Sequence, residues 1–151
     1  MTRSRKTVAV ILAVVSFAVA LGPLVRGDLE IPTGLHHLLH AGAIAIAAAC
    51  GLVAAAPPPP GSAWENPKCL AVAVGAPILA MVLMWPSEYA WLERHPLGHV
   101  AEHLGLVVLG FASAYGGQRY ARGIGWASAL VLVAMAVAAA FGFGVAPAPT
   151  A

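Results

Sequence analysis

The chain has 151 residues, of which 60% are hydrophobic and 9% are charged, and its formal net charge is +2. One soluble core of this size cannot hide so much apolar surface, and the weak charge without a basic stripe excludes a nucleic-acid-binding protein. Composition alone predicts an integral membrane protein.

Five apolar stretches are long enough to cross a hydrocarbon layer of about 30 Å, which takes roughly 20 helical residues. Helix-breaking Gly and Pro residues separate these stretches, and no soluble domain fits between any two of them. We predict an all-α, polytopic membrane helical bundle that forms one transmembrane domain over residues 1–151. The five expected transmembrane helices cover residues 7–25, 35–56, 69–85, 97–117 and 125–145.

The first stretch has features of a signal peptide, because basic residues precede it and Ala18-Val19-Ala20 lies near its end. The apolar run continues past Ala20 through Leu24 and Val25. We therefore expect a retained first helix.

The distribution of Lys and Arg predicts a cytoplasmic amino terminus and a carboxyl terminus outside, because cytoplasmic loops are enriched in these residues. With this orientation only Arg26 and Arg94 lie on the outer side. The other six lie inside: Arg3, Arg5, Lys6, Lys68, Arg119 and Arg122. We expect a multi-pass protein of the cell membrane, in a bacterial plasma membrane.

All six histidines fall in two short clusters, one opening the second expected helix and one around the start of the fourth. Both helices enter the membrane from outside, so every histidine is expected at the same membrane face. At 3.6 residues per turn, side chains four residues apart share a helix face. His36 with His40, and His99 with His103, form two such pairs that can present imidazole nitrogens to one point between the helices.

Three further residues near these pairs are candidates. Glu102 follows His99 by three residues, and an ionised carboxylate at that depth is expensive without a partner, so we expect it to hydrogen-bond a histidine or help hold a cation. His95 precedes Pro96 and is expected outside the helix, at the entrance. His37 points about 100° away from His36. His95 and His37 are the weaker candidates.

A single histidine at a membrane interface is more often structural than a ligand, because it can extend its ring toward the headgroups. Two facing pairs beside a carboxylate favour a metal or metal-cofactor site instead, since imidazole suits copper, zinc, iron and haem. The predicted ligands are His36, His40, His99, His103 and Glu102, with His37 and His95 as weaker members.

The segment from Trp85 to Leu104 contains Trp, Tyr and the motif His-Pro-x-x-His-x-x-Glu-His in that order. It resembles the corresponding segment of caa3-type cytochrome c oxidase assembly factors of the CtaG kind, and His36-x-x-x-His40 resembles that family's earlier histidine helix. The resemblance covers helices two to four, roughly half of the chain. It implies a membrane protein associated with copper delivery, with matching positions at His36, His40, His99, Glu102 and His103, and with His95 at the entrance.

The leading hypothesis is a copper-binding chaperone or accessory subunit of a membrane copper enzyme, without catalysis of its own. Zinc fits imidazole ligands nearly as well as copper. Expected partners are the lipid bilayer and other membrane subunits of a metalloenzyme complex, and no nucleic acid.

Three alternatives remain open. One is an electron-transfer subunit in which one histidine from each helix ligates a single b-type haem. Another is a structural packing subunit of a larger membrane complex. The third is an iron hydroxylase or desaturase with His36-His37-x-x-His40 as a histidine box, although such sites need about eight histidines facing the cytoplasm.

Overall fold

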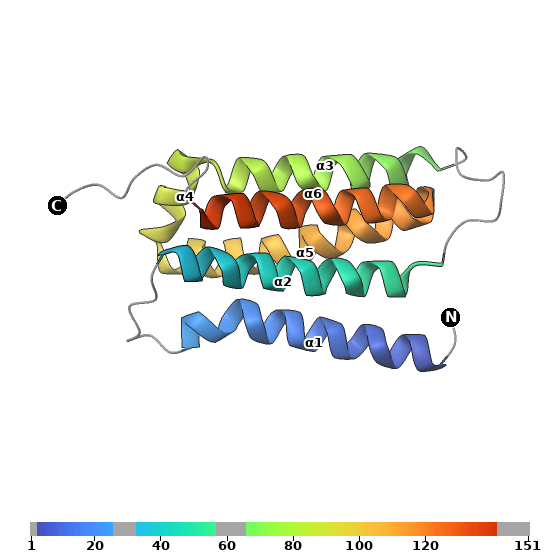
Figure 1. Cartoon of the computed structure of the whole chain (residues 1–151). Helices are drawn as coiled ribbons and strands as arrows, with labels where there is room; N and C mark the ends of the chain where they lie inside the picture. Colours follow the sequence, from blue (N-terminus) through green and yellow to red (C-terminus); the bar gives the residue numbers. More distant parts are fainter. Residues whose placement is uncertain (1–2, 26–32, 57–65, 142–151) are drawn as a thin grey trace.

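The computed structural model describes residues 3–25, 33–56 and 66–141, and their regular structure is entirely helical. The all-α prediction is confirmed for these residues. Five long helices alternate in direction along the chain, and the short α4 of eight residues lies across one end of the bundle (Figure 1). The six helices are α1 (Arg3–Val25), α2 (Thr33–Ala54), α3 (Pro67–Leu83), α4 (Pro86–Glu93), α5 (Pro96–Tyr120) and α6 (Arg122–Ala140).

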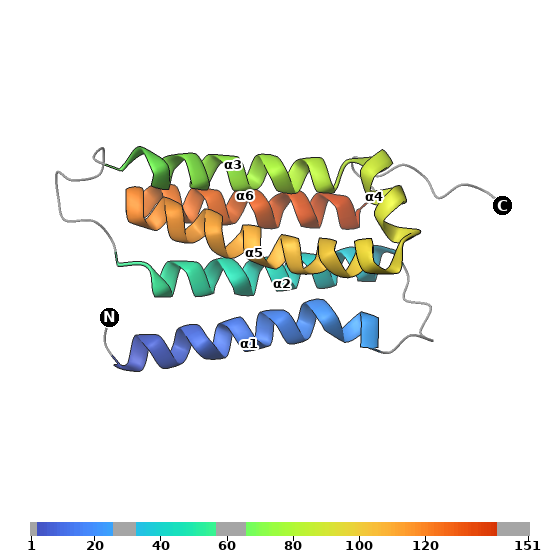
Figure 2. The same cartoon turned by 180° about the vertical axis from the view of Figure 1, so that it is seen from behind.

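The helices α2 and α5 pack along each other and form the centre of the bundle. Helix α1 covers one side of this pair, whereas α3 and α6 lie on the other side, as the view from behind also shows (Figure 2). The central pair therefore carries both histidine clusters.

Three helices contain segments that are long and apolar enough to cross a membrane: Ser4–Gly22, Leu35–Ala54 and Pro96–Tyr120. The apolar segments Pro67–Leu83 and Gly123–Ala138 are shorter. At 1.5 Å per residue, the 17 residues of α3 extend about 26 Å, slightly less than a typical hydrocarbon layer of about 30 Å. Three candidate spans fit a membrane protein.

Large apolar side chains are exposed on the outer faces of the bundle, where a water-soluble protein would rarely expose so many. They include Val10 and Val14 of α1, Ile78 of α3 and Leu130 of α6, each more than half exposed. Many of the buried residues are small, mostly Ala, Gly and Ser. This distribution suits a bundle surrounded by lipid, whose helices associate through close packing.

Glycines bring the helix backbones into direct contact at the end of the bundle away from the histidines. A Cβ atom added to Gly51 of α2 would lie 2.9 Å from the backbone nitrogen of Tyr115 in α5. A Cβ added to Gly117 of α5 would lie 2.7 Å from the Cα atom of Gly125 in α6. No side chain fits at either contact, so these helices associate through direct contact between their backbones.

Two buried side chains connect α1 to α2. Ser16 Oγ donates a hydrogen bond to the carbonyl oxygen of Ala43 over 2.8 Å. Cys50 donates through its Sγ atom to the carbonyl oxygen of Ala9 over 3.1 Å. These bonds hold α1 beside the central pair along much of its length.

The structure differs from the sequence prediction mainly at residues 86–93, which were expected to be a break and form α4. Pro86 occupies the first helical turn, where its missing N–H has no cost, and Glu88 lies where the helix dipole favours a negative charge. Helix α5 also continues to Tyr120, beyond the expected end at residue 117.

Helix α6 ends at Ala140, whereas the fifth helix was expected to reach residue 145. Residues 142–145 lie outside the described residues, as do the expected connecting segments 26–32 and 57–65.

A four-histidine candidate metal centre

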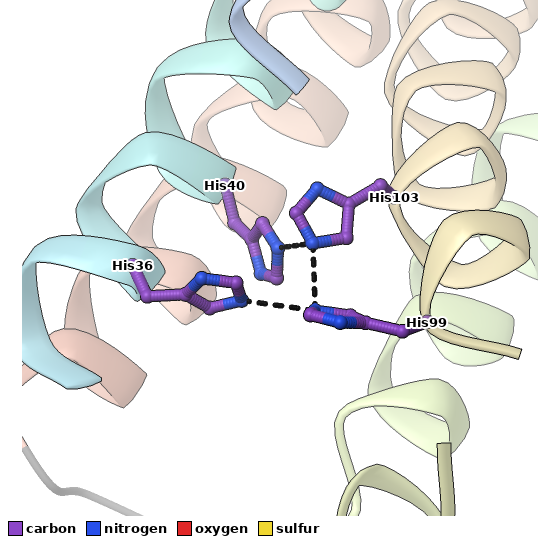
Figure 3. A group of neighbouring side chains, drawn as sticks. All are labelled: His36, His40, His99 and His103. Carbon is purple, nitrogen blue, oxygen red and sulfur yellow. Dashed lines mark hydrogen bonds between the residues drawn. The ribbon is translucent and has the colours of Figure 1, made fainter. Parts of the chain in front are cut away.

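The first turns of α2 and α5 lie side by side at the end of the bundle that α4 covers (Figure 1). His36 and His40 project from α2 toward His99 and His103, which project from α5 (Figure 3). One ring nitrogen of each residue lies within 4.8 Å of the other three. These four residues, hereafter the four-histidine cluster, form a group that can hold a metal ion.

The Nε2 atoms of the cluster form a chain of close contacts. His40 Nε2 lies 2.8 Å from His103 Nε2. His103 Nε2 lies 2.9 Å from His99 Nε2, which in turn lies 3.3 Å from His36 Nε2. All four nitrogens thus face the same small volume.

Protons alone cannot satisfy these contacts between neutral rings. A hydrogen bond between two ring nitrogens needs a proton on one and a lone pair on the other, and each neutral nitrogen offers one or the other. His103 Nε2 contacts two neighbours and so does His99 Nε2, so linear hydrogen bonds satisfy at most two of the three contacts. A cation that accepts all four lone pairs removes the conflict.

The distances fit a metal ion without large movements of the rings. With metal–nitrogen bonds of about 2.0–2.1 Å, neighbouring ligand nitrogens lie about 2.9 Å apart in a square plane and about 3.3 Å apart in a tetrahedron. The observed contacts span 2.8 to 3.3 Å. Three of the six distances between the four nitrogens therefore match ligand spacing, and all six are within 4.8 Å.

The orientation of His103 is fixed by the first helix. Its Nδ1–H donates a hydrogen bond to the carbonyl oxygen of Ala20 in α1 over 2.6 Å. Because this bond places the proton on Nδ1, the neutral ring directs its Nε2 lone pair into the cluster. A ligating histidine commonly has such an outer partner, which sets its tautomer and raises its basicity.

The cluster has a buried inner pair and a partly exposed outer pair. His40 and His103 are only 2% and 1% exposed, whereas His36 and His99 are partly accessible. One turn deeper, four buried apolar side chains of α2 and α5 form a layer beneath the cluster, with the Ser16 hydroxyl of α1 bonded to the carbonyl at its edge; the four are Ala43, Ile44, Leu106 and Val107. The cluster is therefore accessible from the end of the bundle that carries His36 and His99.

Glu102 and His37 are both 2% exposed but lie outside the four-histidine cluster. Residues four apart share a helix face, so His37 lies on the same face of α2 as Ala41, and Glu102 lies on the same face of α5 as Leu106. Ala41 and Leu106 belong to the apolar core that α2 and α5 share with α3 and α6. Both polar residues thus lie on the side of α3 and α6, and their role as ligands stays a prediction.

His95 lies outside the cluster, in the connection between α4 and α5. Its backbone is extended, which confirms the expectation that it precedes the helix. Its Nδ1–H donates to the carbonyl oxygen of Trp91 over 2.7 Å, and its ring stacks on the Trp91 ring at 4.1 Å. This exposed histidine is thereby held by α4.

Two contributors to the site have no signal in the sequence. The Ala20 carbonyl belongs to the backbone of an apolar helix, and only the packing of α1 on the central pair brings it to His103. The stacking of Trp91 on His95 depends on α4, which was not expected.

No protein-family model, curated protein or solved structure matches the chain. The four-histidine cluster is therefore the feature of the molecule that indicates a function.

Proposed function

We propose that this chain is a five-span membrane protein that binds one copper ion in the four-histidine cluster at the outer membrane face. It acts as a copper chaperone or as an accessory subunit of a membrane copper enzyme. The observation that carries the proposal is the convergence of four imidazole Nε2 atoms at ligand spacing, one of them oriented by the Ala20 carbonyl.

The arrangement of charges supports the orientation. Arg5 and Lys6 begin α1, Lys68 begins α3 and Arg119 ends α5, so all four lie at the end of the bundle opposite the histidines. Lys and Arg concentrate on the cytoplasmic side of membrane proteins. With these residues inside, the four-histidine cluster lies at the outer face.

A single ion suits the cluster better than a haem. In a haem with two histidine ligands, the macrocycle lies between the two rings and excludes other side chains from that plane. Here four ring nitrogens lie within 4.8 Å of one another, so the neighbouring imidazoles fill the space that the macrocycle would need. An absorption spectrum of the purified protein tests this choice, because a Soret band would identify haem.

Copper is favoured over zinc by ligand geometry and accessibility. Divalent copper prefers tetragonal nitrogen sites and binds most nitrogen donors more tightly than zinc does. The two shortest contacts, 2.8 and 2.9 Å, are closer to square-planar spacing, whereas the third contact, 3.3 Å, matches tetrahedral spacing. His36 and His99 are partly exposed and offer the route for metal exchange that a copper chaperone needs.

Metal analysis of the purified protein after incubation with copper tests the proposal. We expect about one copper per chain in the wild type, and less than a tenth of that amount in His40→Ala and His103→Ala after dialysis, because even outer-shell partners contribute about 10–100-fold to metal affinity. His95→Ala is the matched control and should retain the ion.

Two outcomes would contradict the proposal. Stoichiometric copper in both inner-pair variants would remove the four-histidine cluster as the binding site. If the cluster binds zinc tightly and copper does not displace it, the cluster is still a metal site but its assignment to copper is wrong.

A further inference from the structure

A second feature lies at the opposite end of the bundle from the four-histidine cluster. A cavity of about 380 Å³ opens between α2 and α6, with walls formed mainly by Ala, Leu and Val side chains. Ala49 and Leu52 of α2 face Trp126 and Leu130 of α6 across it. Its volume lies within the range of about 300–1,000 Å³ that is usual for small-molecule sites.

Two polar side chains interrupt this apolar lining. Gln118 of α5 is 7% exposed, and its Oε1 atom is buried without a hydrogen-bond partner. Arg5 of α1 donates from Nη2 to the carbonyl oxygen of Ala55 over 3.3 Å, which holds its guanidinium at the cavity. The cavity thus has a permanent positive charge beside it, and the Gln118 amide oxygen lies buried behind its lining, where a ligand reaches it only when the side chain turns.

These groups define the chemistry of an occupant. A buried acceptor without a donor is unfavourable, so a ligand that brings a hydroxyl to Gln118 Oε1 gains a hydrogen bond and removes that cost. A guanidinium matches phosphate in both charge and shape. The apolar walls suit a hydrocarbon chain.

The side from which the occupant enters is also indicated. Trp126 and Leu130 are 57% and 66% exposed on the outer face of α6, where the bundle would meet lipid. Lys68 and Arg119 lie at the same end of the bundle, and clustered cations at this face attract anionic headgroups. The ligand therefore approaches from the bilayer.

We propose that this cavity is a specific site for an anionic phospholipid whose headgroup carries free hydroxyls, as in phosphatidylglycerol. One acyl chain occupies the space between α2 and α6, and the phosphate pairs with Arg5. The Gln118 side chain turns toward the cavity, so that its Oε1 accepts a hydrogen bond from a headgroup hydroxyl. The site is independent of the proposed copper function.

Native mass spectrometry of the purified full-length protein, titrated with single lipids in detergent, tests this site. The lipids are phosphatidylglycerol, phosphatidic acid, which lacks the headgroup glycerol, and phosphatidylcholine, which has no net charge. We expect phosphatidylglycerol to bind about tenfold more tightly than phosphatidylcholine, because a charged hydrogen bond distinguishes them. Phosphatidic acid should bind with intermediate affinity.

Variants separate the contributions of charge, hydroxyl and cavity. Arg5→Ala should weaken both anionic lipids, whereas Gln118→Leu should weaken phosphatidylglycerol alone. Ala49→Phe fills the cavity and should weaken all three lipids. Lys6→Ala is the matched control, because it removes an exposed charge from the next residue and leaves the cavity lining intact.

The proposal is overturned if phosphatidylcholine binds as tightly as phosphatidylglycerol, or if Lys6→Ala weakens binding as much as Arg5→Ala does. Equal binding of phosphatidylglycerol by the wild type and Ala49→Phe would also overturn it. Circular dichroism of each variant checks folding, and Arg5→Ala keeps the test informative if Gln118→Leu does not fold.

Discussion

The two ends of the α2–α5 interface use opposite means to bring the same helices together. At one end, four imidazole rings meet, and their nitrogens approach to 2.8–3.3 Å. At the other end, Gly51 of α2 lies directly against the backbone of Phe111 and Tyr115 in α5. One end is filled by large polar side chains, and the other has no side chain between the backbones.

This difference indicates that one end of the interface stabilises the fold and that the other end forms the candidate metal site. Backbone contact at the glycine end fixes the distance between the helices, since packing in membranes depends on small residues. The histidine end adds polar groups that cost free energy when buried without partners. The glycine end should therefore control stability, and the histidine end should control metal binding.

The largest effect is expected from Gly51→Leu. A Cβ atom at this position would already lie 2.9 Å from the backbone nitrogen of Tyr115, so the leucine must push α2 away from α5. Overpacking of this kind costs about 1–3 kcal/mol or more, and the displaced helix should also lose copper. Thermal unfolding by circular dichroism and metal analysis measure the two effects.

Gly42→Leu is the control for that substitution. It introduces the same side chain in the same helix, where an added Cβ atom meets nothing within 4 Å. Equal destabilisation by the two substitutions would show that backbone contact at Gly51 does not hold the helices together.

The double variant His40→Leu/His103→Leu should lose copper binding and keep the fold. Replacing both partners of a buried polar contact with apolar side chains of similar size is often nearly neutral for stability. We expect no stoichiometric copper by metal analysis, and an unfolding temperature close to that of the metal-free wild type. A protein that no longer folds would contradict the proposed division between the two ends.

Smaller effects are expected from single substitutions in the outer pair. His36→Ala and His99→Ala each leave three imidazoles, including the buried inner pair, so copper affinity should fall about 10–100-fold. Competition with a chelator of known affinity gives the dissociation constant. A larger loss here than in His103→Ala would show that the partly exposed pair contributes more to copper binding than the buried pair.

The smallest effect is expected from Ser16→Ala, which removes the hydrogen bond from Ser16 Oγ to the Ala43 carbonyl. Hydrogen bonds between membrane helices average about 0.6 kcal/mol, so unfolding in sodium dodecyl sulfate should shift slightly, with copper content unchanged. Ser128→Ala is the control, because Ser128 Oγ donates to the Ile124 carbonyl within its own helix. Identical shifts would show that the bond from α1 contributes nothing.

The central features of the site could be predicted because they depend on helical periodicity. The spacing of His36 with His40, and of His99 with His103, already placed each pair on one helix face. Alternating helices then put both pairs at one end of the bundle, where the structure also places them.

Other features could not be predicted because they depend on contacts between distant segments. The hydrogen bond from His103 to Ala20 involves a backbone carbonyl and requires α1 to pack against α5. Helix α5 also continues beyond its expected end at Gly117 as far as Tyr120, directly after the glycine pair Gly116-Gly117. Their close contacts with α3 and α6 explain why glycine is suitable there.

The apolar layer beneath the four-histidine cluster also determines the direction in which a bound ion can travel. Ala43, Ile44, Leu106 and Val107 are all buried one turn below the inner pair and offer no ligand atoms from their side chains. Moving a charged ion through such a layer is prohibitively unfavourable without water or polar partners. Under the proposed copper function, an ion that arrives at His36 and His99 should therefore depart past the same two residues, so that the cluster takes up and releases its ion at one end of the bundle.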